Sequence, residues 1–176
     1  YSCNGLVSVE IESALDSIGK HAFYSCNSLE SVNITGSVAK ICESAFSYCE
    51  NLKSLKLAKG PDYIGNYAFY RCQSLGNVEI PESTTHIGEN TFQYCLNLES
   101  VTLPESITSL GASSFDNCTS LMSVSCKWES LADVSADESA FNGIPAEATL
   151  YVPTGTKSIY QAKAPWNGFS NISEKD

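Results

Sequence analysis

The chain has 176 residues, of which 43% are hydrophobic, and these proportions suit one folded domain or two small ones. Twenty acidic side chains against ten basic ones give a net charge of -10. This balance argues against a nucleic acid as partner, because nucleic-acid binding depends on clustered Lys and Arg. No stretch approaches the ~18 consecutive apolar residues of a membrane-spanning helix, so we expect no membrane insertion by this chain.

One sequence motif recurs through residues 1–126 with a period of 23 residues. Each copy begins with a cysteine, has a leucine three residues later, and continues with two apolar residues at alternate positions. The cysteines are Cys3, Cys26, Cys49, Cys72, Cys95 and Cys118. Alternation over so short a run predicts a strand with one buried face in every copy.

The second half of each copy carries an apolar residue, usually followed by Gly, and a phenylalanine five residues further on. The phenylalanines are Phe23, Phe46, Phe69, Phe92 and Phe115, and we expect all five to be fully buried. A fixed period in the 20s with one short strand per unit is typical of a leucine-rich-repeat solenoid, whose stacked units bury a continuous column. We therefore predict parallel strands on one concave face. Twenty-three residues leave no room for a helix opposite, so the convex face should hold turns and short 3₁₀ segments.

The period breaks once, and this break divides the chain. Residues 1–126 form six repeats that open in the middle of a repeat, so we expect further repeats upstream. Residues 127–153 form an irregular last repeat with an insertion. Residues 154–176 have no repeat phase, but they contain a short helical pattern before Pro165 and the apolar residues Trp166, Phe169 and Ile172. Such a segment is expected to cap the last coil.

With six in-phase copies, residues 1 to about 153 resemble the BspA-like leucine-rich repeats of bacterial surface proteins. The ending "LYVPTGTKSIYQAKAPWNGF" also resembles the terminal cap of secreted members. The resemblance implies export or a cell-surface location, a place within a longer protein, and adhesion to host or bacterial proteins. It supplies no catalytic residues and no fixed binding motif.

Eight cysteines in a chain that we expect to be exported raise the question of disulfides. Equivalent positions of stacked coils lie close enough to be bridged, but their side chains point the same way. Buried free thiols are therefore the preferred interpretation, and at least one disulfide is the alternative. A spacing of 23 without a C-x-x-C pair does not suit a zinc site.

No pattern in the sequence indicates an enzyme. The two histidines, His21 and His86, occupy different repeat phases, so a shared site is not expected. Asp133, Ser135 and Asp137 imitate the first half of a calcium loop, but the glycine at the sixth position is missing. We therefore predict no catalytic residues, no cofactor and no metal.

Two surfaces are candidates for binding a protein or a glycan. The first is the outward face of the strands, where the candidate residues are Ser31, Asn33, Ser54, Lys56, Asn77, Glu79, Ser100 and Thr102. The second is an aromatic edge formed by Tyr24, Tyr48, Tyr70 and Tyr94, each one or two residues before a cysteine. In the alternative interpretation, the strand face is only solvated and the tyrosines only shield the flank.

The sequence thus favours a non-enzymatic binding module that is secreted or displayed on the cell surface, and that is monomeric. Adhesion through protein–protein contact is the expected role. The rival interpretation is a structural spacer that holds another domain of a longer surface protein away from the cell.

Overall fold

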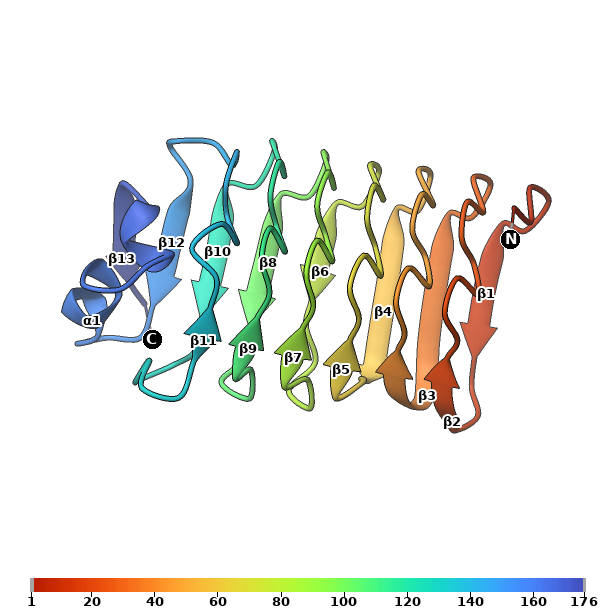
Figure 1. Cartoon of the computed structure of the whole chain (residues 1–176), viewed down its shortest axis with the longest axis horizontal. Helices are drawn as coiled ribbons and strands as arrows, with labels where there is room; N and C mark the ends of the chain where they lie inside the picture. Colours follow the sequence, from red (N-terminus) through yellow and green to blue (C-terminus); the bar gives the residue numbers. More distant parts are fainter. Residues whose placement is uncertain (1, 176) are drawn as a thin grey trace.

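The computed structural model describes residues 2–175, apart from the side chain of Lys59. The chain winds into a solenoid in which each coil adds one strand to a parallel ladder (Figure 1). The strands of this ladder are β1 (Ser8–Ile11), β3 (Ser31–Ile41), β4 (Ser54–Lys59), β6 (Asn77–Glu79), β8 (Ser100–Leu103), β10 (Ser123–Cys126), β12 (Thr149–Val152) and β13 (Asn171–Glu174). The predicted leucine-rich-repeat solenoid is confirmed.

The opposite face differs in detail from the prediction of turns and 3₁₀ segments, because it contains short strands as well. They are β2 (Leu15–Ile18), β5 (Tyr63–Ile64), β7 (His86–Ile87), β9 (Ser109–Leu110) and β11 (Ser135–Ala136). β3 is long enough to pair with β1 and β4 at its start and with β2 and β5 at its end. The isoleucine column of the sequence therefore lies on a second ladder, where coils are also joined by backbone hydrogen bonds.

The phenylalanines form a continuous stack through the interior. Ring centroids of successive residues from Phe23 to Phe141 lie 4.9–5.4 Å apart, with interplanar angles between 2° and 10°. Phe46, Phe69, Phe92 and Phe115 are completely buried, as predicted. The prediction is wrong for Phe23, which is only partly buried, because it is the first ring and is stacked on one side alone.

The cysteine column packs beside the phenylalanines. The thiols of Cys49, Cys72, Cys95 and Cys118 each donate to the carbonyl of the phenylalanine 26 residues earlier, at 3.1–3.4 Å. Six of the eight cysteines are buried, and all eight are free thiols. Cys3 is exposed, contrary to its expected place in the core, because no described coil packs over it.

We expect native protein to react with a thiol reagent at Cys3 and more slowly at the half-buried Cys42, while the six buried thiols stay protected. Burial raises the pKa of Cys49 and of Cys118 to about 12, so little thiolate forms there near neutral pH. Denatured protein should titrate eight thiols without added reductant. Equal counts in both states, or fewer than eight after denaturation, would contradict the prediction.

The same pKa shifts predict how the free energy of unfolding changes with pH. A thiol ionises in the unfolded chain at about pH 8.5 but stays protonated in the folded chain. The free energy of unfolding should therefore fall as the pH rises from about 8.5 towards 12.

The end of the chain adds one more strand to the ladder. After α1 (Lys157–Gln161) and the 3₁₀ turn η1 (Trp166–Gly168), β13 pairs in parallel with β12, and Ile172 lies opposite Leu150. The helix predicted before Pro165 is confirmed. Ile172 lies in this strand, whereas Trp166 lies in η1.

Candidate functional site

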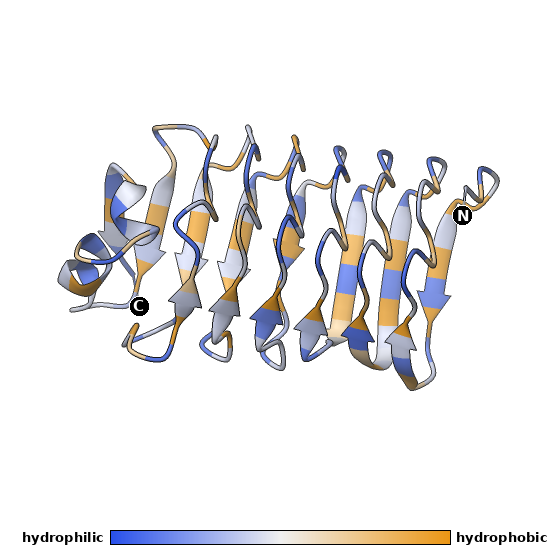
Figure 2. Ribbon diagram, in the orientation of Figure 1, coloured by the Kyte–Doolittle hydropathy of each residue, from blue (hydrophilic) through white to orange (hydrophobic). Residues whose placement is uncertain are grey.

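The strand face presents the eight predicted residues in two parallel rows. One row contains Ser31, Ser54, Asn77 and Ser100, and the other contains Asn33, Lys56, Glu79 and Thr102. All eight side chains are exposed or half-buried, while the residues between them point into the core. Apolar and polar residues accordingly alternate along the strands (Figure 2).

The ladder on this face is interrupted between β4 and β6. β4 is hydrogen-bonded only to β3, and β6 only to β8, so the strands belong to two separate sheets in the described chain. Just beyond β6, the ring of Pro81 packs directly over Gly60, where an added Cβ would lie 2.0 Å from the proline Cγ. Each strand at the interruption therefore has one unpaired edge.

A groove of about 1010 Å³ lies at the interruption. Its lining includes residues 55–58 of β4 and residues 79–83, which begin at the end of β6. Leu55 and Leu57 are each 9% exposed, whereas the equivalent Val101 and Leu103 are 1% and 0% exposed. The groove thus combines an apolar floor with a polar rim.

The row of Asn33, Lys56, Glu79 and Thr102 lines this groove, whereas the row beginning with Ser31 does not. Within the row that begins with Ser31, the Ser100 hydroxyl donates a 2.7 Å hydrogen bond to the Asn77 side chain. The structure therefore brings half of the predicted strand-face residues to one concave feature.

A second hollow, of about 610 Å³, adjoins the first, since both include Thr102 and Lys127. Lys127 forms an ion pair with Glu82 at the shared boundary. At the far end, the ammonium group of Lys175 lies 5.7 Å from the Tyr151 ring centroid. Sequence analysis did not single out Lys127, which directly follows β10, or Tyr151, which lies on β12 in register with Ser125.

The tyrosine edge (Tyr24, Tyr48, Tyr70 and Tyr94) also forms as predicted. Neighbouring rings lie 5.3–5.9 Å apart with interplanar angles of 57–85°. All four side chains are half-buried. Neighbouring rings are therefore steeply tilted or nearly perpendicular to one another.

Arg71 lies within this edge, and sequence analysis missed it. Its guanidinium carbon is 5.8, 5.6 and 4.9 Å from the ring centroids of Tyr48, Tyr70 and Tyr94. Its Nε donates a 3.3 Å hydrogen bond to the Tyr70 hydroxyl, which raises the pKa of Arg71. Its position in the repeat could have indicated it. Arg71 directly precedes a cysteine, and Tyr48 and Tyr94 hold the same position in the two adjacent coils.

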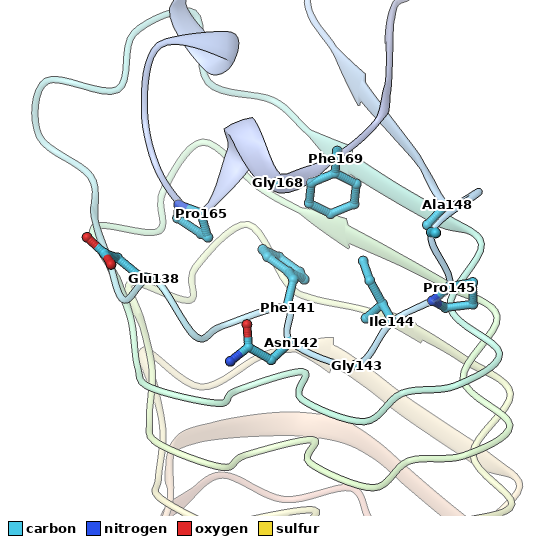
Figure 3. Close-up of a pocket in the computed structure, with 11 residues that line it drawn as sticks. Glu138, Phe141, Asn142, Gly143, Ile144, Pro145, Ala148, Pro165, Gly168 and Phe169 are labelled. Atoms are coloured by element: carbon cyan, nitrogen blue, oxygen red, sulfur yellow. The ribbon is translucent and has the colours of Figure 1, made fainter.

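A third cavity, of about 230 Å³, lies where the terminal segment meets the last coil. Figure 3 shows the side chains of Phe141, Ile144 and Phe169 on its walls, with Glu138 at the margin. Apolar side chains thus predominate at this junction.

In the acidic insertion, the Asp137 carboxylate is engaged in hydrogen bonds with a neighbouring residue. Asp137 accepts hydrogen bonds from the backbone N–H and hydroxyl of Ser139 at 2.9 and 2.6 Å, which lower the pKa of Asp137. Within residues 2–175, no three His, Cys, Asp or Glu side chains gather in a way that would hold a metal ion. In the same part of the chain, no helix has the length and apolar character needed to cross a membrane.

Several solved structures are similar to this chain. A T. pallidum leucine-rich repeat protein is 34% identical with a TM-score of 0.65, over 68% of this chain and 58% of that protein. A leucine-rich repeat protein of Bacteroides ovatus is 17% identical with a TM-score of 0.47, over 99% and 62% of the two chains. A leucine-rich cell surface protein of Faecalibacterium prausnitzii is 17% identical with a TM-score of 0.39, over 99% and 61%. The chain thus spans less than two thirds of each of these proteins.

A comparison with curated proteins finds no match. Among family models, the BspA type leucine rich repeat region matches in six copies, over residues 1–122 and 40–163. These two ranges together take in nearly the whole chain, including the irregular coil. The chain therefore belongs to the family of BspA-type leucine-rich repeat proteins.

Proposed function

We propose that this chain is a protein-binding module of an exported or cell-surface protein, and that it mediates adhesion through its strand face. The observation that carries the proposal is the groove at the interruption between β4 and β6. Its apolar floor and polar rim match the composition of protein-binding surfaces, in which a desolvated centre is surrounded by polar groups. The family, which is in general non-catalytic, supports a binding role and an extracellular location.

The geometry of the strand face favours binding for a second reason. Lys56, Glu79 and Thr102 project from strands that are fixed by their neighbours in the sheet, so little conformational entropy is lost when they contact a partner. The groove also lies in the middle of the solenoid, where a ligand can reach strands on both sides. A spacer, the rival function, would need neither feature.

The test is a quadruple variant in which Lys56, Asn77, Glu79 and Thr102 are changed to Ala. Labelled protein is titrated onto intact bacterial and epithelial cells, before and after the cells are treated with protease. Wild-type protein should bind saturably to at least one cell type and lose that binding after proteolysis. The variant should bind at least tenfold more weakly, which requires a loss of only about 1.4 kcal/mol over four contacts.

The variant should keep its melting temperature, because substitutions at exposed positions usually change stability by less than about 0.5 kcal/mol. The matched control changes Tyr24, Tyr48, Tyr70 and Tyr94 to Ser and should retain protein-dependent binding. If the tyrosine variant alone loses that binding while folded, the contact surface is the tyrosine edge. If wild-type protein shows no saturable binding, the spacer function is favoured.

A further inference from the structure

Arg71 is the only arginine of the chain, and the tyrosine edge holds it in one orientation. Tyr48 and Tyr94 approach the guanidinium from the two adjacent coils, and the Tyr70 hydroxyl accepts from its Nε. The ion pairs of residues 2–175 are formed by Lys20, Lys53 and Lys127, so Arg71 has no carboxylate partner there. An oriented guanidinium thus stands among aromatic rings without a counter-ion.

The fold does not require large side chains at this position. The turn before each cysteine needs a residue in the left-handed region, and Tyr48, Arg71 and Tyr94 adopt it with φ of 61°, 58° and 60°. Ser25 and Asn117 make the same turn in the flanking coils, both with φ of 57°. Left-handed backbone is costly for a bulky residue and least costly for Gly or Asn. Three consecutive coils therefore accept strain that small residues would reduce, which points to a role beyond folding.

We infer that the tyrosine edge with Arg71 is a binding site for a glycan that carries a carboxylate, such as a uronic acid or sialic acid residue. The planar fork of a guanidinium matches the two oxygens of a carboxylate. Tyrosine rings offer apolar faces to the C–H surfaces of sugar rings and hydroxyls to their polar groups. The site is distinct from the strand-face groove and does not depend on the function proposed for that groove.

The periodicity of the edge suits a linear glycan. Rings repeat every 5.3–5.9 Å over four coils, so consecutive sugar rings meet consecutive tyrosines. The net charge of -10 repels an acidic ligand from most of the surface, which leaves Arg71 to fix where the carboxylate docks. An acidic peptide would also bring carboxylates, but it would gain less from a row of aromatic rings.

The first test uses the wild-type chain on an array of uronic acid and sialic acid oligosaccharides, each printed beside its methyl ester. The ester keeps the sugar rings and removes the charge. We expect binding to the free acids and at least tenfold weaker binding to the esters. Equal binding to acids and esters, or no binding to any acid, would overturn the inference.

The second test is Arg71→Asn, which keeps a residue that tolerates the left-handed turn, as Asn117 does. Binding to the free acids should fall at least tenfold, and the melting temperature should not fall. Tyr94→Asn, designed in the same way, should also weaken binding. The matched control Lys40→Asn removes one exposed positive charge from the end of β3 that pairs with β2 and β5, and it should bind as wild type does.

Three further results would contradict the inference of a glycan site. Unchanged glycan binding by Arg71→Asn would remove Arg71 from the site. Equal affinity of wild-type protein for a soluble oligo-glutamate peptide would identify the partner as an acidic polypeptide instead. Loss of glycan binding in the quadruple strand-face variant would place the site on the other surface. Because that variant has its own readout on protease-treated cells, failure of the glycan site and failure of the proposed function remain distinguishable.

Discussion

Phe69→Ala is expected to lower the free energy of unfolding by about 3–5 kcal/mol. Phe69 is completely buried in the middle of the ring stack, and its ring centroid lies 5.3 Å from those of both Phe46 and Phe92. Its removal takes apolar surface out of the core and leaves a cavity that the neighbouring coils cannot close without shifting the stack. The measurement is equilibrium denaturation of the variant and the wild type under the same conditions.

The matched control is Phe23→Ala, which removes the same side chain at the end of the same stack. Phe23 is only partly buried and contacts one ring instead of two, so the loss of stability should be clearly smaller. Equal effects at Phe69 and Phe23, or an effect at Phe69 below about 1 kcal/mol, would show that the stack is not what stabilises the solenoid.

The interior of this fold can be predicted from the sequence because each coil repeats the same contacts. Once Cys49, Leu52, Leu55 and Phe69 are assigned to a phase, the position of every equivalent residue follows from the period of 23. Translation by one coil then brings like residues together, so cysteines neighbour cysteines and phenylalanines stack on phenylalanines. The outward rows on the strand face follow from the same translation.

The features that sequence analysis missed are those that differ between neighbouring coils. At the interruption between β4 and β6, Pro81 packs over Gly60, and this proline–glycine contact is not repeated by the period of 23. The cluster around Arg71 depends on tyrosines that alternate between two phases, so no single column reveals it. The partial burial of Phe23 depends on its place at the end of the stack. Periodic reasoning describes an average coil, whereas the two candidate sites arise from departures from that average.

Residues 154–175 close the end of the core with large aromatic side chains. Trp166 is fully buried. Its ring centroid lies 5.5 Å from that of Phe141, the last ring of the phenylalanine stack, and 5.4 Å from that of Trp128. Tyr160 donates a 2.8 Å hydrogen bond to the Trp128 carbonyl. Lys163 donates to two further carbonyls of the irregular coil, at 2.6 and 2.9 Å.

Deletion of residues 154–176 should therefore cause aggregation, and not a clean loss of stability by a monomer. The truncation uncovers Phe141 and Trp128 and leaves the outer edge of β12 without β13, so it creates an apolar patch next to an unpaired strand. Both features favour association between chains. Size-exclusion chromatography with light scattering and a thermal melt would measure the outcome. Tyr160→Phe is the control, since it removes one hydrogen bond at a cost of about 1 kcal/mol and should leave a soluble monomer. A soluble, monomeric truncation with an unchanged melting temperature would show that the segment is a tail and that the last coil needs no cap.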